Sequence, residues 1–394
     1  MAVLDIPSGH RPVAQLPRAI ELTAFALVVA HAIYLVACYV QGSWLIGPDG
    51  KGIASDFVNV WAAGKFVLQH TPVLAYDWPT HKAMEEVAIG HAFDGYFGWH
   101  YPPMFLFVAA SLALMPYAAA YLFWVVITFP AYLAAVRAII GERIGYLLAA
   151  AFPAVLSNFI VGQNGFLTAA LLGGTLLLMP TRAILAGCLL GVLTYKPHFG
   201  LLFPLVLAAS GQWRTFIAAG VIATLLAGAA WLAFGSETWI AFVWSVPHTS
   251  QAFLSDGWAD WAKLQTLFGL LRTLGAPEQI AWAVHIAFAL AVAAAVTLLW
   301  RSRAVYELKA AALATGTMLA TPYLYTYDLV VLAVPFAFLF RMGRASGFIR
   351  FELPGIALAC ALIASFPFVA APVGFAAILV VATLIMRRLT SVAP

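Results

Sequence analysis

The stretch of sequence that decides the fold is residues 18–40, RAIELTAFALVVAHAIYLVACYV. A helix of roughly 17–25 mainly apolar residues can cross a bilayer, and runs of this kind recur along the chain. The whole sequence is 64% hydrophobic and only 9% charged, with a mean hydropathy of +0.95. These values exclude an ordinary soluble domain. Because backbone groups in lipid must bond within their own segment, we expect an all-α polytopic integral membrane protein.

Basic residues set the expected topology of the apolar segments. Arg11 and Arg18 precede the first segment, and Arg387 and Arg388 follow the last, so both termini should be cytoplasmic. An even number of crossings is then required, and we expect about 12 transmembrane helices, with a shallow or re-entrant piece within 101–137. The thirteen apolar segments have the approximate limits 18–40, 101–115, 117–137, 144–161, 165–179, 183–195, 198–210, 214–234, 279–300, 308–321, 326–341, 351–369 and 372–387.

Other features of composition narrow the class of protein. The first fifteen residues lack an apolar core with a small-residue cleavage site, so we expect no removable signal peptide. The net charge of +4 is small and dispersed, which indicates no nucleic-acid partner. The three cysteines lie within apolar runs and suggest packing residues rather than a metal site or a disulfide framework: Cys38, Cys188 and Cys360.

Two long polar stretches separate the apolar segments of what we interpret as one membrane domain, residues 1–394. The stretch 41–100 contains six acidic residues and three lysines but no arginine, which predicts an outer location. Within it we expect juxtamembrane helices from Ser55 to about His70 and from Pro79 to about Gly90. The stretch 235–262 should be an outer loop at headgroup level because it carries four tryptophans: Trp239, Trp244, Trp258 and Trp261.

Unusual polar residues gather at segment ends that should face the outer side. Asp56 and Asn59 are three residues apart and share a helix face. We predict Asp56 as a catalytic residue, and Asn59 and eight residues of four short motifs as substrate-binding residues. The eight are His100 and Tyr101 in HYPPMF, Gln163 and Asn164 in VGQNGF, Lys196 and His198 in TYKPHFG, and Tyr325 and Tyr327 in TPYLYTYDL. The last motif also contains Tyr323 and Asp328.

Each of these residues also has a simpler interpretation. Asp56 could be a helix-start acid, with Ser55 as the capping residue. GQNG could be a connecting turn, and Lys196 could extend its amine to the interface. Tyrosines at helix ends could form an ordinary aromatic belt. The combination favours a site, because a lysine beside proline and histidine can cradle an anion and a nearby acid can act as a base.

Four further residues are expected to be structural. His81 and Glu85 are four apart and could bind a metal, but a solvated surface pair is the simpler expectation. His31 and His285 lie inside apolar runs and should be packed or hydrogen-bonded core histidines.

The order of the motifs resembles glycosyltransferase family 87. The resemblance covers roughly residues 20–235 and rests on four stretches in order: SDFVNVWAAGKFVLQHTPVLAYDW, YPPMFLFVAASLALMPYAAAYLFW, GQNGFLTAALLGG and LAGCLLGVLTYKPHFGLLFPLVL. That family includes polyprenyl-phosphate-mannose-dependent α-1,2-mannosyltransferases of the GT-C fold.

The resemblance implies a chemistry for the site. The donor would be a sugar on a polyprenyl phosphate, used at the outer face of the bacterial inner membrane, and the acceptor a glycolipid or glycan. Asp56 would be the general base of an inverting transfer. The leaving lipid phosphate needs a cation rather than an acid, and Lys196 aided by His198 is the candidate. No Asp-x-Asp motif is present in the loop, so neither a metal nor another cofactor is expected.

Alternatives remain open at this point. The segment TPYLYTYD places Tyr325 and Tyr327 where the family usually carries histidine, and tyrosine does not titrate near neutral pH. A transporter or a flippase for lipid or polysaccharide would also have short broken helices and intramembrane polar groups. A family member with only a scaffolding role is a third possibility. The sugar could be mannose, as the family implies, or glucose, galactose or a pentose.

Overall fold

The computed structural model describes residues 17–392. These residues form helices joined by turns and contain no β-strand, only an isolated β-bridge between Ile46 and Gly52. The all-α prediction is therefore confirmed for the described chain. Arg11 and the first fifteen residues lie outside the described residues, so the predictions about them stay predictions.

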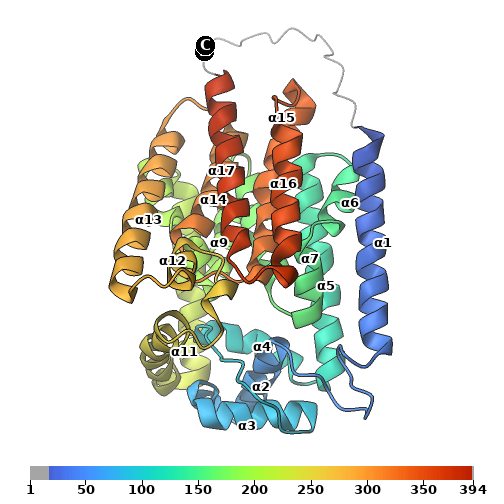
Figure 1. Cartoon of the computed structure of the whole chain (residues 1–394). Coiled ribbons are helices and arrows are strands. Elements are labelled where there is room, and N and C mark those ends of the chain that lie inside the picture. The colour runs from blue at the N-terminus through green and yellow to red at the C-terminus, as the bar shows by residue number, and fades with distance from the viewer. Residues whose placement is uncertain (1–16, 393–394) are drawn as a thin grey trace.

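Six helices are long and apolar enough to cross a membrane, judged by length and composition (Figure 1). A seventh candidate is the pair α6 and α7, which is bent by 61° at the break between its halves. Together with the apolar surface these helices make a multi-pass membrane protein. Their bounds are α1 (Arg18–Val40), α5 (Tyr117–Ile140), α6 (Ile144–Ala150), α7 (Ala154–Val161), α11 (Trp213–Ser250) with η5 (Gln251–Ser255), α13 (Glu278–Arg301), η7 (Thr326–Leu332) with α15 (Ala333–Ser346), and α17 (Val373–Val392).

Shorter helices complete the upper part of the molecule in Figure 1. Several are too short to span a bilayer as straight helices, so twelve crossings stay a prediction. Their bounds are α8 (Gly165–Leu178), α9 (Ala183–Val192), η3 (Leu193–Tyr195), η4 (Pro197–Gly200), α10 (Phe203–Ala209), α12 (Leu267–Thr273), α14 (Tyr306–Ala320), α16 (Glu352–Ser365) and η8 (Phe366–Phe368).

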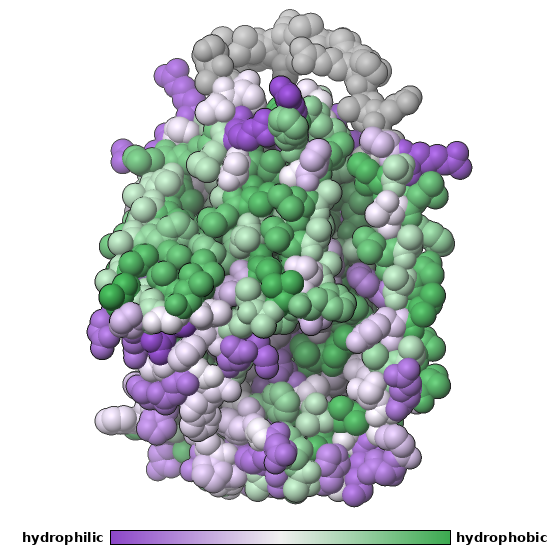
Figure 2. All heavy atoms as spheres, viewed as in Figure 1, coloured by the Kyte–Doolittle hydropathy of each residue, from purple (hydrophilic) through white to green (hydrophobic). Residues whose placement is uncertain are grey.

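The bundle has a buried centre and an apolar exterior. Every residue of α14 from Ala310 to Ala320 is buried, whereas Ala24 is the only buried residue of α1. Figure 2 shows apolar side chains over the middle of the molecule and polar side chains gathered at its two ends. This distribution matches a protein whose middle faces lipid, because exposed apolar helices such as α1 would be costly in water.

The two polar stretches lie at the same end of the molecule, opposite the start of α1 and the end of α17 (Figure 1). The segment 41–100 forms α2 (Phe57–Leu68), η1 (Pro72–Tyr76) and α3 (Trp78–Ile89), close to the two predicted helices. It is followed by η2 (Pro103–Phe105) and the short α4 (Leu106–Leu112), which packs on α2 beside the bundle rather than across it.

Both faces of α2 are buried. Phe57, Trp61 and Gly64 are buried on one face, and Asn59 and Ala63 are buried on the opposite face. The reason is that α3 and α4 both pack on α2, so protein covers all of its sides. A buried α2 fixes its first residues rigidly in the interior.

The stretch 235–262 is largely helical rather than a loop. Helical hydrogen bonding continues along α11 to Ser250, but Gly235 breaks the direction of the helix with φ 78° and ψ 169°. That backbone conformation is essentially restricted to glycine. The turn sends residues 236–250 off in a new direction, and these residues reach the lower end of the molecule. Of the four tryptophans, Trp244 and Trp258 are exposed, as expected for an interface.

Candidate active site

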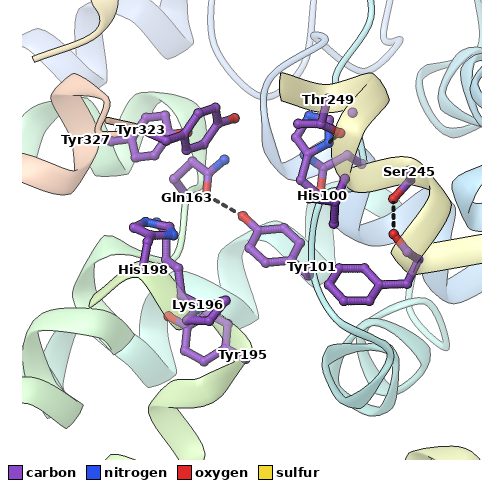
Figure 3. Close-up of a pocket in the computed structure, with 15 residues that line it drawn as sticks. His100, Tyr101, Gln163, Tyr195, Lys196, His198, Ser245, Thr249, Tyr323 and Tyr327 are labelled. Carbon is purple, nitrogen blue, oxygen red and sulfur yellow. Dashed lines mark hydrogen bonds between the residues drawn. The ribbon is translucent and has the colours of Figure 1, made fainter. Parts of the chain in front are cut away.

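A cavity of about 230 Å³ lies where the bundle meets the lower segments (Figure 3). Its walls come from α2, from the segment before η2, from the α7–α8 turn, from η3 and η4, from the second part of α11, and from the segment before and within η7. The lining residues are Asn59, Gly98, His100, Tyr101, Gln163, Tyr195, Lys196, Pro197, His198, Phe242, Ser245, Val246, Thr249, Tyr323 and Tyr327.

The α7–α8 turn brings two predicted residues to this cavity. Gly162 ends α7 with φ 66°, and a Cβ there would approach Tyr121 at 2.6 Å and Phe57 at 2.7 Å. Only glycine fits this turn, which confirms the turn predicted from GQNG. It leaves Gln163 and Asn164 at the start of α8, directly beside the first residues of α2.

Gln163 connects the cavity wall to Asp56. Its Oε1 accepts hydrogen bonds from the Tyr101 hydroxyl at 3.0 Å and from the Asn164 backbone N–H at 3.2 Å. The side chain of Gln163 also interacts with the Asp56 carboxyl. Since Oε1 already accepts two hydrogen bonds, the amide NH₂ group of Gln163 is the part that can donate to the Asp56 carboxyl.

Asp56 occupies the N-terminus of α2 but does not cap it. Its backbone is helical, with φ −54° and ψ −26°, and its side chain makes no capping hydrogen bond. Asp56 is half-buried. The simpler interpretation of Asp56 as a capping acid therefore lacks its defining bond.

Ser55 does not cap α2 either, so that expectation is wrong. Its hydroxyl lies 3.1 Å from the Tyr117 hydroxyl, and Tyr117 in turn donates to the Ile53 carbonyl at 3.0 Å. The start of α2 is held by these contacts to α5 instead of by a local side-chain cap.

The environment of Asp56 makes its carboxyl a weaker acid than usual. Burial raises the pKa of Asp56 to about 6, and the Asp328 carboxylate also raises it. The Gln163 interaction and the positive charges of Lys263 and Lys196 lower this pKa. A carboxyl with a pKa near 6 is mostly ionised at neutral pH and is a better proton acceptor than an ordinary aspartate.

Lys196 lines the cavity but is not a free cation. Its Nζ donates to Asn164 Oδ1 at 2.9 Å and forms a buried ion pair with Asp328 Oδ1. The other carboxylate oxygen of Asp328 accepts from the Tyr325 backbone N–H at 3.1 Å. Because an ammonium has three N–H donors, one remains for a ligand in the cavity.

Aromatic rings form one wall of the cavity. The rings of Tyr325 and Tyr327 are stacked, with centroids 5.7 Å apart and an interplanar angle of 20°. Tyr323 meets Tyr325 edge to face at 5.1 Å and His198 at 6.1 Å. Figure 3 shows Tyr323 and Tyr327 on the same side as His198, opposite His100.

The second part of α11 forms the opposing wall. Thr249 Oγ1 lies 3.0 Å from His100 Nδ1, which links this helix to the segment before η2. Phe242, Ser245 and Thr249 face the cavity from successive turns. The break at Gly235 is thus what places α11 side chains at the site.

The expected solvated pair of His81 and Glu85 is wrong, because both side chains are fully buried under α2. His81 Nε2 and Glu85 Oε1 are 3.7 Å apart, and Glu85 Oε2 accepts weakly from the Phe97 N–H at 3.4 Å. Burial raises the pKa of Glu85 to about 8 and lowers the pKa of His81 to about 3. Among the described residues no group of three His, Cys, Asp or Glu side chains gathers to hold a metal ion, and independence from metal stays a prediction.

The structure brings all of the predicted site residues together. Those that line the cavity directly are Asn59, His100, Tyr101, Gln163, Lys196, His198 and Tyr327. The other three support them: Asp56 interacts with Gln163, Asn164 bonds Lys196, and Tyr325 stacks on Tyr327. His285, outside the site, is buried with Nε2 3.3 Å from the Ala320 carbonyl, as expected of a core histidine, and His31 is half-buried.

Several site residues were missed by sequence reasoning. Asp328 lies in the motif TPYLYTYDL, but the motif does not identify it as the partner of Lys196, although a buried lysine requires a counter-ion. The sequence around Lys263 carries no signal for the site. Tyr195, Phe242, Ser245 and Thr249 line the cavity from helices whose sequence carries no signal for it.

A comparison with protein families identifies the chain. A model of glycosyltransferase family 87 matches residues 99–322. Comparisons with curated proteins and with solved structures each found no match. The matched region contains 11 of the 15 residues that line the cavity, and the other four, Asn59, Gly98, Tyr323 and Tyr327, lie outside it. Because the match covers more than half of the chain, the protein belongs to glycosyltransferase family 87 and is an enzyme that transfers a sugar from a donor to an acceptor.

Proposed function

We propose that the protein transfers a hexose, mannose in the first instance, from a polyprenyl-phosphate sugar to a glycolipid or glycan acceptor. The reaction takes place at the outer face of a bacterial inner membrane, on a GT-C fold, and inverts the anomeric centre. Asp56 is the general base. The observation that carries this proposal is a half-buried Asp56 whose side chain makes no capping hydrogen bond and whose pKa is raised to about 6, beside a cavity lined by polar and aromatic side chains and by Lys196.

The size of the cavity supports a sugar head group rather than a whole lipid. At about 230 Å³ it is smaller than the roughly 300–1,000 Å³ of pockets that enclose drug-sized ligands. One sugar ring fits such a volume, and the lipid tail would then stay in the bilayer. Aromatic walls with a few polar groups are typical of sites that orient a small ligand.

Unpartnered polar atoms around the cavity support the same ligand. Asn59 Oδ1, His198 Nε2 and the Tyr325 hydroxyl are buried without a hydrogen-bond partner among the described residues. Each such group costs about 1–3 kcal/mol if it stays unpaired. The hydroxyls of a sugar would provide both donors and acceptors to these atoms.

The chemistry follows from the geometry and balances. The acceptor oxygen forms a bond to the anomeric carbon while the bond from that carbon to the phosphate oxygen breaks. The lipid phosphate leaves with the electron pair of that bond and gains one negative charge. Asp56 takes the proton of the acceptor hydroxyl and becomes neutral, so the total charge is unchanged. Gln163, held by the Tyr101 hydroxyl, orients the carboxyl, and Lys196 offers its remaining N–H to the sugar.

The test is Asp56→Asn in the purified protein, with transfer measured from a polyprenyl-phosphate hexose. We expect transfer to fall by about a hundredfold or more, because asparagine keeps the shape but cannot accept a proton. No cap is lost, so the melting temperature should stay near that of wild type. Asp94→Asn, at an exposed aspartate of the same stretch, is the matched control and should transfer normally. A folded Asp56→Asn enzyme with near-normal turnover would refute the assignment of the base.

A further inference from the structure

The charges inside the cavity leave the donor phosphate without a dedicated counter-ion. Lys196 is neutralised by Asp328, with which it forms a buried ion pair. Asp56 is negative when it acts as a base. Burial lowers the pKa of His100 to about 4, so that ring is neutral at pH 7. The interior therefore carries no net positive charge, whereas a phosphate in a poorly hydrated place needs one.

Lys263 is the cation near this site that has no partner. It ends η6 (Trp261–Lys263), its side chain is exposed, and it forms no ion pair in the part of the chain that the structure describes. Arg272, the next cation along the chain, stacks on Trp261 at 4.2 Å and donates to the carbonyls of Ser255 and Ala276. Arg272 thus supports the loop, and Lys263 is left free.

The backbone of Lys263 is fixed against the tyrosine wall. The Gln265 backbone N–H donates to the Leu324 carbonyl at 2.7 Å, and the Gln265 side chain donates to the Lys263 carbonyl at 3.1 Å. Leu264 is buried in a cluster that also contains Tyr325. The backbone around Lys263 is therefore held beside the segment that carries the tyrosine wall.

The charge of Lys263 acts on the site itself. It is one of the two positive charges that lower the pKa of Asp56, and its effect there is the larger of the two. Trp258, five residues earlier, is 63% exposed and suits the headgroup level of a membrane. Lipid phosphates lie at that level, which favours a lipid phosphate over a phosphate free in solution.

We propose that Lys263 binds the phosphate of the donor lipid at the rim of the cavity, while Lys196 donates its remaining N–H to the sugar. The ligand class is an isoprenoid phosphate, and the inference rests on the proposed function. Because Lys263 is exposed, its attraction for the phosphate is screened by salt, unlike that of a buried pair. Lys263 is a binding residue in this scheme and takes no part in the proton transfer.

The experiment measures binding of farnesyl phosphate to the purified full-length protein in nanodiscs of uncharged lipid. Farnesol is the control probe, because it lacks the phosphate. Lys263→Gln should weaken farnesyl phosphate binding by about three- to tenfold, the range for one exposed or partly desolvated charge contact. It should also remove most of the salt dependence and leave farnesol binding unchanged. Lys263→Arg should retain most of the affinity, and the exposed Lys51→Gln should match wild type.

The outcomes separate this inference from the proposed function. Wild-type affinity and salt dependence in Lys263→Gln would overturn the role of Lys263 and leave the lipid-phosphate donor standing. A wild-type protein that binds farnesyl phosphate no better than farnesol would overturn the donor class and the inference with it. Inorganic phosphate at the same concentration should not compete, and effective competition would overturn the choice of a lipid phosphate.

Discussion

At the scale of single residues, burial changes what each polar group can do. Asp56 and Asp328 are two aspartates near one cavity, but Asp328 is bound by Lys196 and by a backbone N–H, whereas Asp56 has no such partners. The first is a fixed counter-ion, and the second is available for proton transfer. Environments that separate two carboxyls in this way assign their roles.

This difference predicts the pH dependence of transfer. The base form of Asp56 is lost as pH falls through its pKa of about 6, so kcat/KM should fall about tenfold per unit below that pH. An aspartate with an ordinary pKa would keep its activity to about pH 4. The measurement is a profile of kcat/KM from pH 4.5 to pH 8, with folding checked at each pH.

The control for this profile is Glu85→Gln. Glu85 has its pKa raised to about 8 and is mostly protonated at pH 7, and glutamine resembles that neutral form. The acid limb near pH 6 should therefore persist in Glu85→Gln. An acid limb that disappeared in this variant, or that lay near pH 4 in wild type, would contradict Asp56 as the titrating base.

The sequence could predict the membership of the site because its residue types stand out from an apolar background. Lys196, Gln163 and Asp56 are costly in such a chain unless they work together, and the structure groups them. The sequence could not predict that Asp328 neutralises Lys196, because 132 residues separate them and only the tertiary fold brings η7 to Lys196, which lies between η3 and η4. The sequence also could not predict the burial of His81 and Glu85, because that burial depends on the packing of α3 against α2.

At the scale of elements, the second part of α11 is the feature that sequence patterns missed. Residues 236–250 carry apolar and aromatic residues at helical spacing, but the tryptophans suggested a loop at the interface. The break at Gly235 depends on a backbone conformation that no periodicity shows. That break turns the helix so that Ser245 and Thr249 face the cavity, while Trp244 stays 75% exposed.

The break predicts the effect of Gly235→Ala. A Cβ at Gly235 would meet no atom within 4 Å, so the substitution causes backbone strain rather than a clash. Strain at such a conformation is of the order of 1–3 kcal/mol, and straightening the helix would relieve it by moving Thr249 away from His100. We expect transfer to fall at least tenfold and the melting temperature to fall by a few degrees.

Gly228→Ala is the matched control within the same helix. Gly228 has ordinary helical backbone angles and equally open space at its Cβ, so alanine there should leave transfer unchanged and stabilise the helix slightly. Equal activity in Gly235→Ala and Gly228→Ala would show that the direction of α11 after Gly235 does not matter for the site.

At the scale of the whole molecule, the site lies at one end of an apolar bundle. The apolar exterior of α1, α13 and α16 sets the position of the membrane, and the polar segments that contribute to the cavity lie below it (Figures 1 and 2). This arrangement suits the proposed lipid donor, whose head group would enter from the bilayer while the proposed acceptor enters from the aqueous side. Composition alone predicted the membrane bundle, because apolar length is a direct physical requirement of crossing a bilayer.

The side of the membrane that this end faces follows from the basic residues and is the last prediction. Arg301 and Arg303, and Arg387 and Arg388 near the end of α17, should be cytoplasmic, which places Ala92 and Gln251 outside. Single cysteines at Ala92, Gln251 and Arg303, all exposed positions, are introduced after Cys38, Cys188 and Cys360 are replaced by alanine. In intact spheroplasts a membrane-impermeant thiol reagent should label the first two cysteines, and it should label the third only after permeabilisation. Labelling of Ala92→Cys without Gln251→Cys would separate the two walls of the cavity across the membrane and contradict a shared outer site, whereas labelling of Arg303→Cys alone would place the whole site in the cytoplasm.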